Sequence, residues 1–140
     1  MTVTISTAHR AARNNGTLAL LDAGGSGAPG HAICYGGTRP SDGAATSEAV
    51  LIDVPFSWSA GTIQGDGSIL LSAGPEVLAS ANGVVTWARI FNGLGVRLFD
   101  CDVSIPSGAG DLWLTVAGSG GSTTQVWAGG AVQIASGMMG

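Results

Sequence analysis

The two histidines and two cysteines are the side chains of this chain best suited to metal or nucleophilic chemistry. His31 and Cys34 have a ligand-like spacing, and Cys101 could join them around a zinc ion. Residues at this spacing fall on opposite faces of a strand, however, which opposes shared ligation. We therefore favour the alternative in which both cysteines are small buried hydrophobic residues with free thiols. A Cys34–Cys101 disulfide is geometrically allowed but not expected, because no export signal is visible.

The serines and histidines give no support to hydrolytic chemistry. A catalytic triad would need His9 or His31 beside a serine or cysteine and an acidic partner, and nothing in the sequence locates such a set. The serines that lie among glycines miss the G-x-S-x-G spacing of a hydrolase elbow. These serines are Ser26, Ser119 and Ser122. We expect no catalytic residue, no cofactor and no metal ion, and therefore no enzyme.

Two carboxylates and four tryptophans offer weaker binding chemistry. Asp100 and Asp102 would share one strand face and could bind a divalent cation, but such neighbours are more often a solvated patch or partners for arginine. Tryptophan rings can stack on sugars, although we expect core positions first, interface positions second and a sugar platform third. The tryptophans are Trp58, Trp87, Trp113 and Trp127.

The scarcity of charge is the most unusual property of the composition. Charged residues make up 10% of the chain, against about 25% in ordinary domains, and the five cations are all arginines. Arginine is enriched at protein interfaces, whereas lysine is depleted there and favoured on free surfaces. We therefore expect an exterior that is largely shared with other chains, with a compositional bias toward glycine and alanine as the alternative.

Charge and hydropathy also argue against two classes of partner. The formal net charge is −4, and no arginines cluster beyond Arg10 and Arg13, so we expect no direct binding to nucleic acid. No segment approaches the length of a bilayer span, so we expect no membrane partner.

These residues must be positioned by one domain that spans residues 1–140. Residues 1–6 predict an extended arm able to add to a neighbour's sheet, and residues 7–23 predict a helix capped by Ser6 or Thr7. Turn dipeptides recur about every ten residues over 31–136 and predict about eight strands. We therefore expect a mainly β fold, a jelly-roll-like antiparallel β-sandwich with one N-terminal helix. The helix face expected to be buried consists of Ala8, Ala11, Ala12, Asn15, Leu18 and Ala19.

The clearest element is a hairpin between Val84 and Ile105. Asn92-Gly93 is a strong turn dipeptide, and it separates two arms of about eight residues each. No third glycine follows Gly95, so the segment fails the dinucleotide-binding fingerprint. Neither face of the two strands consists mainly of polar side chains. The pair is therefore either sandwiched within the domain or covered by a neighbour.

Two motifs and the order of elements carry a resemblance. GTRP at 37–40 and TWARIF at 86–91 lie in an order of elements that spans about Thr7 to Ser136. This arrangement resembles a family of small phage and prophage virion proteins. Similar proteins act as cement or decoration proteins with a jelly-roll fold, joining major capsid subunits at the outer surface of tailed-phage heads.

The resemblance implies a structural virion protein, made in the bacterial host cytoplasm and located on the capsid exterior. Its partners would be the major capsid protein and a second copy in a homodimer. A tail or fibre component and a carbohydrate-binding module are the alternatives. The residues expected at interfaces belong to the arm, to exposed arginines and to a flexible methionine end. They are Thr2, Val3, Thr4, Ile5, Arg10, Arg13, Arg39, Met138 and Met139.

Overall fold

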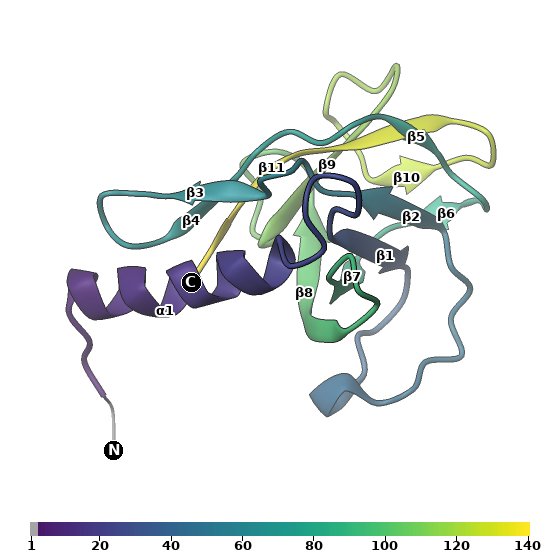
Figure 1. Ribbon diagram of the computed structural model, residues 1–140. Coiled ribbons are helices and arrows are strands. Elements are labelled where there is room, and N and C mark those ends of the chain that lie inside the picture. Colours follow the sequence, from purple (N-terminus) through teal and green to yellow (C-terminus); the bar gives the residue numbers. More distant parts are fainter. Residues whose placement is uncertain (1–2) are drawn as a thin grey trace.

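The computed structural model describes residues 3–140 and shows a mainly β protein with one N-terminal helix (Figure 1). Residues 3–6 precede the helix and form neither helix nor strand. The elements in chain order are α1 (Thr7–Leu21), β1 (His31–Tyr35), a 3-10 turn η1 (Ser41–Gly43), β2 (Ile52–Pro55), β3 (Gly61–Ile63), β4 (Ile69–Leu71), β5 (Val77–Leu78), β6 (Gly83–Val84), β7 (Trp87–Phe91), β8 (Arg97–Ser104), β9 (Leu112–Val116), β10 (Gln125–Val126) and β11 (Ala131–Met139).

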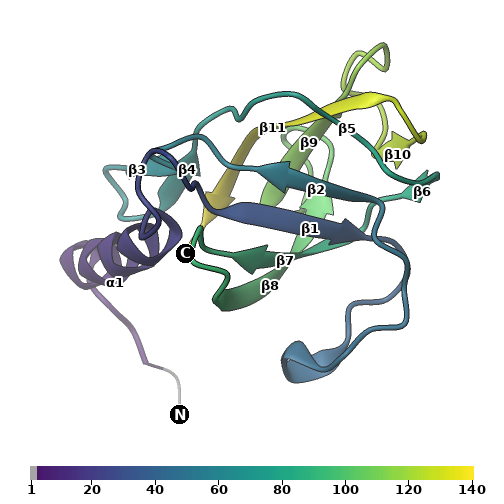
Figure 2. The same cartoon turned by 45° about the vertical axis from the view of Figure 1, so that its right-hand side comes forward.

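Most strands belong to one curled sheet with the order β2-β1-β7-β8-β9-β11-β4-β3, and β5 pairs with β11 beside it. The β8–β9 pair is parallel, and the other pairs in this order are antiparallel. β6 and β10 form a separate two-stranded sheet. The long sheet curls until β2 contacts β11 (Figure 2). The predicted mainly β fold with a single N-terminal helix is therefore confirmed.

The core lies on the inner face of this curl. Alternate residues of several strands are fully buried, as expected for strands with one face in a core. They include Ile52, Val54, Ala88, Ile90, Leu112, Leu114, Val132 and Ile134. Pro55, which cannot donate to a ladder, ends β2, and β2 is a terminal strand of the sheet.

The predicted hairpin is present as β7 and β8, but its turn differs from the prediction. β8 has eight residues, whereas β7 has only five. The Asn92 side chain bends the chain over a longer turn, because its Oδ1 accepts hydrogen bonds from the backbone N–H groups of Leu94 and Val96, both at 3.0 Å. Gly95, with φ of 81°, adopts the left-handed conformation there. The Asn92-Gly93 dipeptide therefore marks the turn without forming a two-residue loop.

Helix α1 begins as predicted, since the Ser6 hydroxyl oxygen accepts a hydrogen bond from the His9 N–H at 3.1 Å. The predicted buried face, however, is correct at Leu18 and wrong at most of its other positions. The buried residues are Asn14, Leu18 and Leu21, whereas the Asn15 side chain is exposed. Exposed with it are Ala8, Ala12 and Ala19. Alanine is so small that the helix gains more by burying its leucines, and Asn14 is satisfied there by a bond to the Gly67 carbonyl at 2.7 Å.

Within residues 3–140, no helix is both long and apolar enough to cross a membrane.

Candidate functional site

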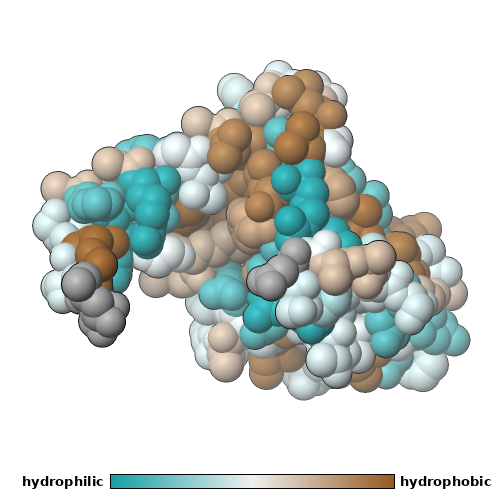
Figure 3. Space-filling view, turned by 90° about the horizontal axis from the view of Figure 1, so that it is seen from below, coloured by the Kyte–Doolittle hydropathy of each residue, from teal (hydrophilic) through white to brown (hydrophobic). Residues whose placement is uncertain are grey.

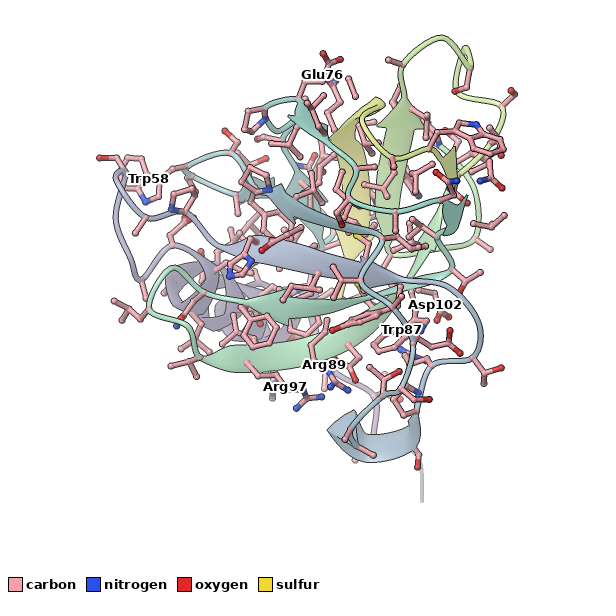
Figure 4. All side chains as sticks on the ribbon, turned by 90° about the vertical axis from the view of Figure 1, so that its right-hand side faces the viewer. Trp58, Glu76, Trp87, Arg89, Arg97 and Asp102 are labelled. Atoms are coloured by element: carbon pink, nitrogen blue, oxygen red, sulfur yellow. The ribbon has the colours of Figure 1, made fainter. Side chains whose placement is uncertain are left out.

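An arginine–aspartate cluster gathers on the outer face of β7 and β8 (Figure 4). Arg89 and Asp100 face each other across the two strands and form a bidentate pair, Nε to Oδ1 at 2.9 Å and Nη2 to Oδ2 at 3.0 Å. Both side chains are nearly buried, with 11% and 7% exposed. Arg97 Nη2 lies 3.3 Å from Asp100 Oδ2, and Arg39 Nε lies 3.6 Å from Asp102 Oδ1. The interpretation of these aspartates as partners for arginine is confirmed.

Burial and hydrogen bonds within this cluster change the pKa values of Asp100 and Arg89. Burial alone would raise the pKa of Asp100, but hydrogen bonds from Arg89 and Arg97 outweigh burial and hold that pKa below its usual value. The hydrogen bond to Asp100 raises the pKa of Arg89 in turn. Asp100 is therefore ionised at neutral pH, and the pair is a fixed structural charge pair.

Aromatic rings extend this cluster along the same face. Tyr35 stacks on Trp87 with ring centroids 4.6 Å apart, and the Arg89 guanidinium lies 5.5 Å from the Trp87 centroid. Trp87 is 1% exposed, because the chain's own loop at residues 36–50 covers it. The apolar hairpin was predicted to be covered either within the domain or by a neighbouring chain. At Trp87 the cover comes from within the domain.

Side chains of the sheet hold that loop through its backbone carbonyls. Trp87 Nε1 donates to the Gly36 carbonyl at 3.0 Å, and Thr86 Oγ1 donates to the Gly37 carbonyl at 2.7 Å. Arg89 Nη2 donates to the Ala44 carbonyl at 2.8 Å. The loop, including the GTRP motif, is therefore held in one position against β7 and β8.

A pocket of about 360 Å³ lies between the loop and β8. Arg39 and Arg97 line it, together with Ser41 and Asp100. The guanidinium of Arg97 packs against Gly43, whose φ of 69° suits glycine and where a Cβ would lie 2.3 Å from Arg97 Cζ. Arg39 is one of the predicted interface residues, and it is exposed here.

The tip of the β7–β8 hairpin adds apolar surface next to this pocket. Leu94 is 68% exposed and Val96 is 53% exposed, directly before Arg97 in the chain. We call Leu94, Val96, Arg97 and Arg39 the hairpin surface. In the view from below, hydrophobic side chains gather at one end of the face and hydrophilic ones form a band beside them (Figure 3).

Apolar side chains are also exposed at the other end of β7, which is about 16 Å long at 3.3 Å per residue. Leu78, Val84 and Trp127 are 68%, 50% and 61% exposed. They belong to neighbouring segments, because Val84 pairs with Gln125 and the Ala128 N–H donates to Asn82 Oδ1 at 2.8 Å. We call Leu78, Val84 and Trp127 the distal surface. Figure 1 shows β5, β6 and β10 together at that end of the molecule.

The zinc and disulfide alternatives do not fit the geometry. Cys34 and Cys101 both pair with Ala88, from β1 and from β8, so a whole strand separates them and their Cα atoms lie about 9.6 Å apart, too far for a disulfide. Both are free and buried, and burial raises the pKa of Cys34 and raises that of Cys101 to about 12. Among the described residues, no three His, Cys, Asp or Glu side chains are placed to hold a metal ion.

The predicted interface residues divide into exposed and buried ones. Val3 is 76% exposed, and Thr4, Arg13 and Met138 are exposed as well. Ile5 and Arg10 are half-buried, and Arg10 Nη1 donates to the Asp66 carbonyl at 3.3 Å. Thr2 lies outside the described residues.

Met139 corrects the prediction of a flexible methionine end, since it is 8% exposed and belongs to the core as the last residue of β11. β11 carries its pairing with β4 to this residue, which leaves only Met138 on the outside.

Sequence reasoning missed the apolar residues of both surfaces. The signal was present, because Asn82-Gly83 and Asn92-Gly93 are turn-type dipeptides, and the residues beside them, Val84, Leu94 and Val96, are apolar where polar residues are usual.

Comparisons of the chain with protein-family models, with curated protein sequences and with solved structures found no match. The resemblance to phage virion proteins therefore stays a prediction.

Proposed function

We propose that this chain is a structural virion protein, a cement or decoration protein that binds the outer surface of a phage capsid and clamps adjacent major capsid subunits. A clamp needs two docking surfaces and a stiff body between them. It needs no catalytic residue and no cofactor, and we propose that the chain is not an enzyme.

The observation that carries the proposal is the exposure of large apolar side chains at both ends of β7. Leu94 and Val96 protrude at one end, and Leu78, Val84 and Trp127 protrude at the other. A chain with only 10% charged residues leaves such surfaces poorly protected in water. Burial against other protein chains would remove this apolar area from water, at about 25 cal/mol for each Å².

The fold supports the body of such a clamp. The half-sheet β2-β1-β7-β8 and the half-sheet β9-β11-β4-β3 meet at the parallel β8–β9 pair, and the curl brings β2 to β11. We propose that these halves are the two layers of a divergent jelly-roll-like β-sandwich. Such a chain would be made in the bacterial host cytoplasm and would reach the virion exterior as a homodimer, which suits a symmetric shell.

The test is binding to isolated capsids of the phage or prophage that encodes the chain. Mass action adds binding free energy to the assembled shell and not to free subunits, so the chain should raise the temperature at which shells release DNA. Particle reconstruction should show its density outside the capsid, between subunits. Absence of the protein from purified virions, or density on the tail only, would reject the proposal, and tail density would favour a tail or fibre component.

A carbohydrate-binding module is kept as a second candidate, because two tryptophans are exposed, Trp58 at 52% and Trp127 at 61%. Exposed tryptophan rings suit stacking on sugars as well as interface anchoring. A glycan array together with sugar-induced changes in tryptophan fluorescence would separate the two. Saturable binding that a Trp127→Ala change abolishes would favour the sugar site over the capsid clamp.

A further inference from the structure

We propose that the pocket between the 36–50 loop and β8 binds a carboxylate that a partner protein presents, an Asp or Glu side chain or a chain terminus. The hydrogen bonds that hold the 36–50 loop against β7 do not require a pocket at this position. The identity of the partner rests on the proposed function, whereas the carboxylate site itself is a property of the isolated chain.

The pocket brings the guanidinium groups of Arg39 and Arg97 to one residue, Asp100. Arg97 Nη2 lies 3.3 Å from Asp100 Oδ2, and Arg39 Nη1 donates to the Asp100 backbone carbonyl at 3.3 Å. The Asp100 carboxylate also accepts two hydrogen bonds from Arg89, so Arg89 and Arg97 share its single negative charge. Two positive charges that line one pocket repel each other, and an added anion relieves that repulsion.

In the contacts among the described side chains, both guanidinium groups keep donors for a ligand. An arginine has five N–H donors, while Arg97 has one short contact to Asp100, and Arg39 donates one bond to Asp100 and lies at the longer 3.6 Å from Asp102. Arg39 and Arg97 have 41% and 39% of their side chains exposed, so an anion can reach them. The Ser41 side chain also lines the pocket and can donate a further hydrogen bond.

The chemistry favours a carboxylate over a phosphate. The cluster holds the three guanidinium groups of Arg39, Arg89 and Arg97 against the carboxylates of Asp100 and Asp102, within a chain of net charge −4. A carboxylate brings a single negative charge to this site, whereas a phosphate group carries about −1.5 to −2 and would meet the exposed Asp102. The planar fork of arginine also matches a carboxylate with two parallel bonds.

The site is preformed, which reduces the cost of binding. Arg97 packs against Gly43, and the loop that carries Arg39 is fixed by three side-chain bonds to its backbone carbonyls. Its neighbours on the hairpin surface, Leu94 and Val96, are exposed and apolar. A partner segment with an acidic residue beside apolar residues would therefore fill the surface, since arginine with apolar anchors is typical of interface hot spots.

The test uses the full chain and a hexaglutamate peptide as the probe, with binding followed by arginine Nε–H NMR signals and by calorimetry. Arg39→Gln or Arg97→Gln should each weaken binding about tenfold, because each removes charge-assisted hydrogen bonds. Arg13→Gln removes the same charge from an exposed position on α1 and should change affinity by less than about twofold.

Arg97→Lys is the control for misfolding of the Arg97→Gln variant. It keeps the positive charge but loses the planar guanidinium donors, so it should bind hexaglutamate with intermediate affinity. The inference fails if hexaglutamate does not bind, if Arg13→Gln weakens binding as much as Arg97→Gln, or if inorganic phosphate binds more tightly than the peptide. Binding of hexaglutamate by a chain that ignores capsids would uphold the carboxylate site and reject the proposed function. Capsid binding that Arg39→Gln and Arg97→Gln leave unchanged would uphold the proposed function and show that the capsid does not use this site.

Discussion

At the scale of single residues, the buried pair of Arg89 and Asp100 connects the sheet to the loop that covers it. Asp100→Asn leaves the Arg89 guanidinium nearly buried without its counter-charge, which typically costs about 3 kcal/mol. Asp102→Asn is the matched control, because the Asp102 side chain is 60% exposed and its loss should cost less than about 0.5 kcal/mol. Urea unfolding at neutral pH should show this difference. Equal effects of the two changes would contradict the structural role of the pair.

The same residue gives the stability a defined pH dependence. The pKa of Asp100 is lower in the folded chain than in the unfolded one, so its stabilisation is fully present above about pH 4 and disappears as the pH falls through the folded value. The difference in unfolding free energy between the native chain and Asp100→Asn should therefore shrink as the pH is lowered below about 4. A difference that stays constant down to pH 2 would show that Asp100 titrates normally.

The two thiols should be inert in the folded protein. With burial raising the pKa of Cys101 to about 12, its thiolate fraction at pH 8 is about a thousandfold below that of an ordinary cysteine. A colorimetric disulfide reagent should modify neither thiol at a measurable rate until urea unfolds the chain, and then both at once. Fast modification of one thiol in the folded state would mean that its strand opens locally.

At the scale of elements, the attachment of α1 depends on an asparagine. Asn14 Nδ2 donates to the Gly67 carbonyl in the β3–β4 turn, so Asn14→Ala removes this bond and leaves a buried carbonyl without its partner, at a cost of about 1–3 kcal/mol. Asn15→Ala is the control, since Asn15 is exposed on the same helix and alanine favours helices. The temperature of thermal unfolding should be lower than that of the native chain for Asn14→Ala only. If both variants unfold at the same temperature as the native chain, the buried leucines alone hold α1 in place.

The elements also show what the sequence could predict. Local signals were sufficient for the Ser6 cap and for the position of the β7–β8 hairpin at Asn92-Gly93. The buried helix face was not predictable from period alone, because a small polar residue becomes buried only when a turn far along the chain offers a carbonyl.

The candidate site divides in the same way. Arg39 was expected at an interface from its residue type. Its neighbour Arg97 was not, because only the folding of the 36–50 loop over β8 places Gly43 against Arg97. Non-local packing of this kind leaves no mark in the spacing of residues along the chain.

At the scale of the whole molecule, the two ends of β7 should act separately in docking. Lysine is depleted at interfaces and strongly hydrated, so Leu94→Lys with Val96→Lys should disable the hairpin surface, and Leu78→Lys with Trp127→Lys should disable the distal surface. All four side chains are at least half exposed, so each double variant should unfold within about 0.5 kcal/mol of the native chain and be more soluble.

On capsids, a clamp gains stability only when both ends are engaged, since the second contact forms at high effective concentration once the first is made. Each double variant should therefore bind shells at least about a hundredfold more weakly than the native chain and fail to raise their melting temperature. The quadruple variant should not bind. The matched control is Ala12→Lys, which adds the same charge at an exposed position on α1 that belongs to neither surface. If one double variant binds and stabilises shells as the native chain does, the clamp does not use that end.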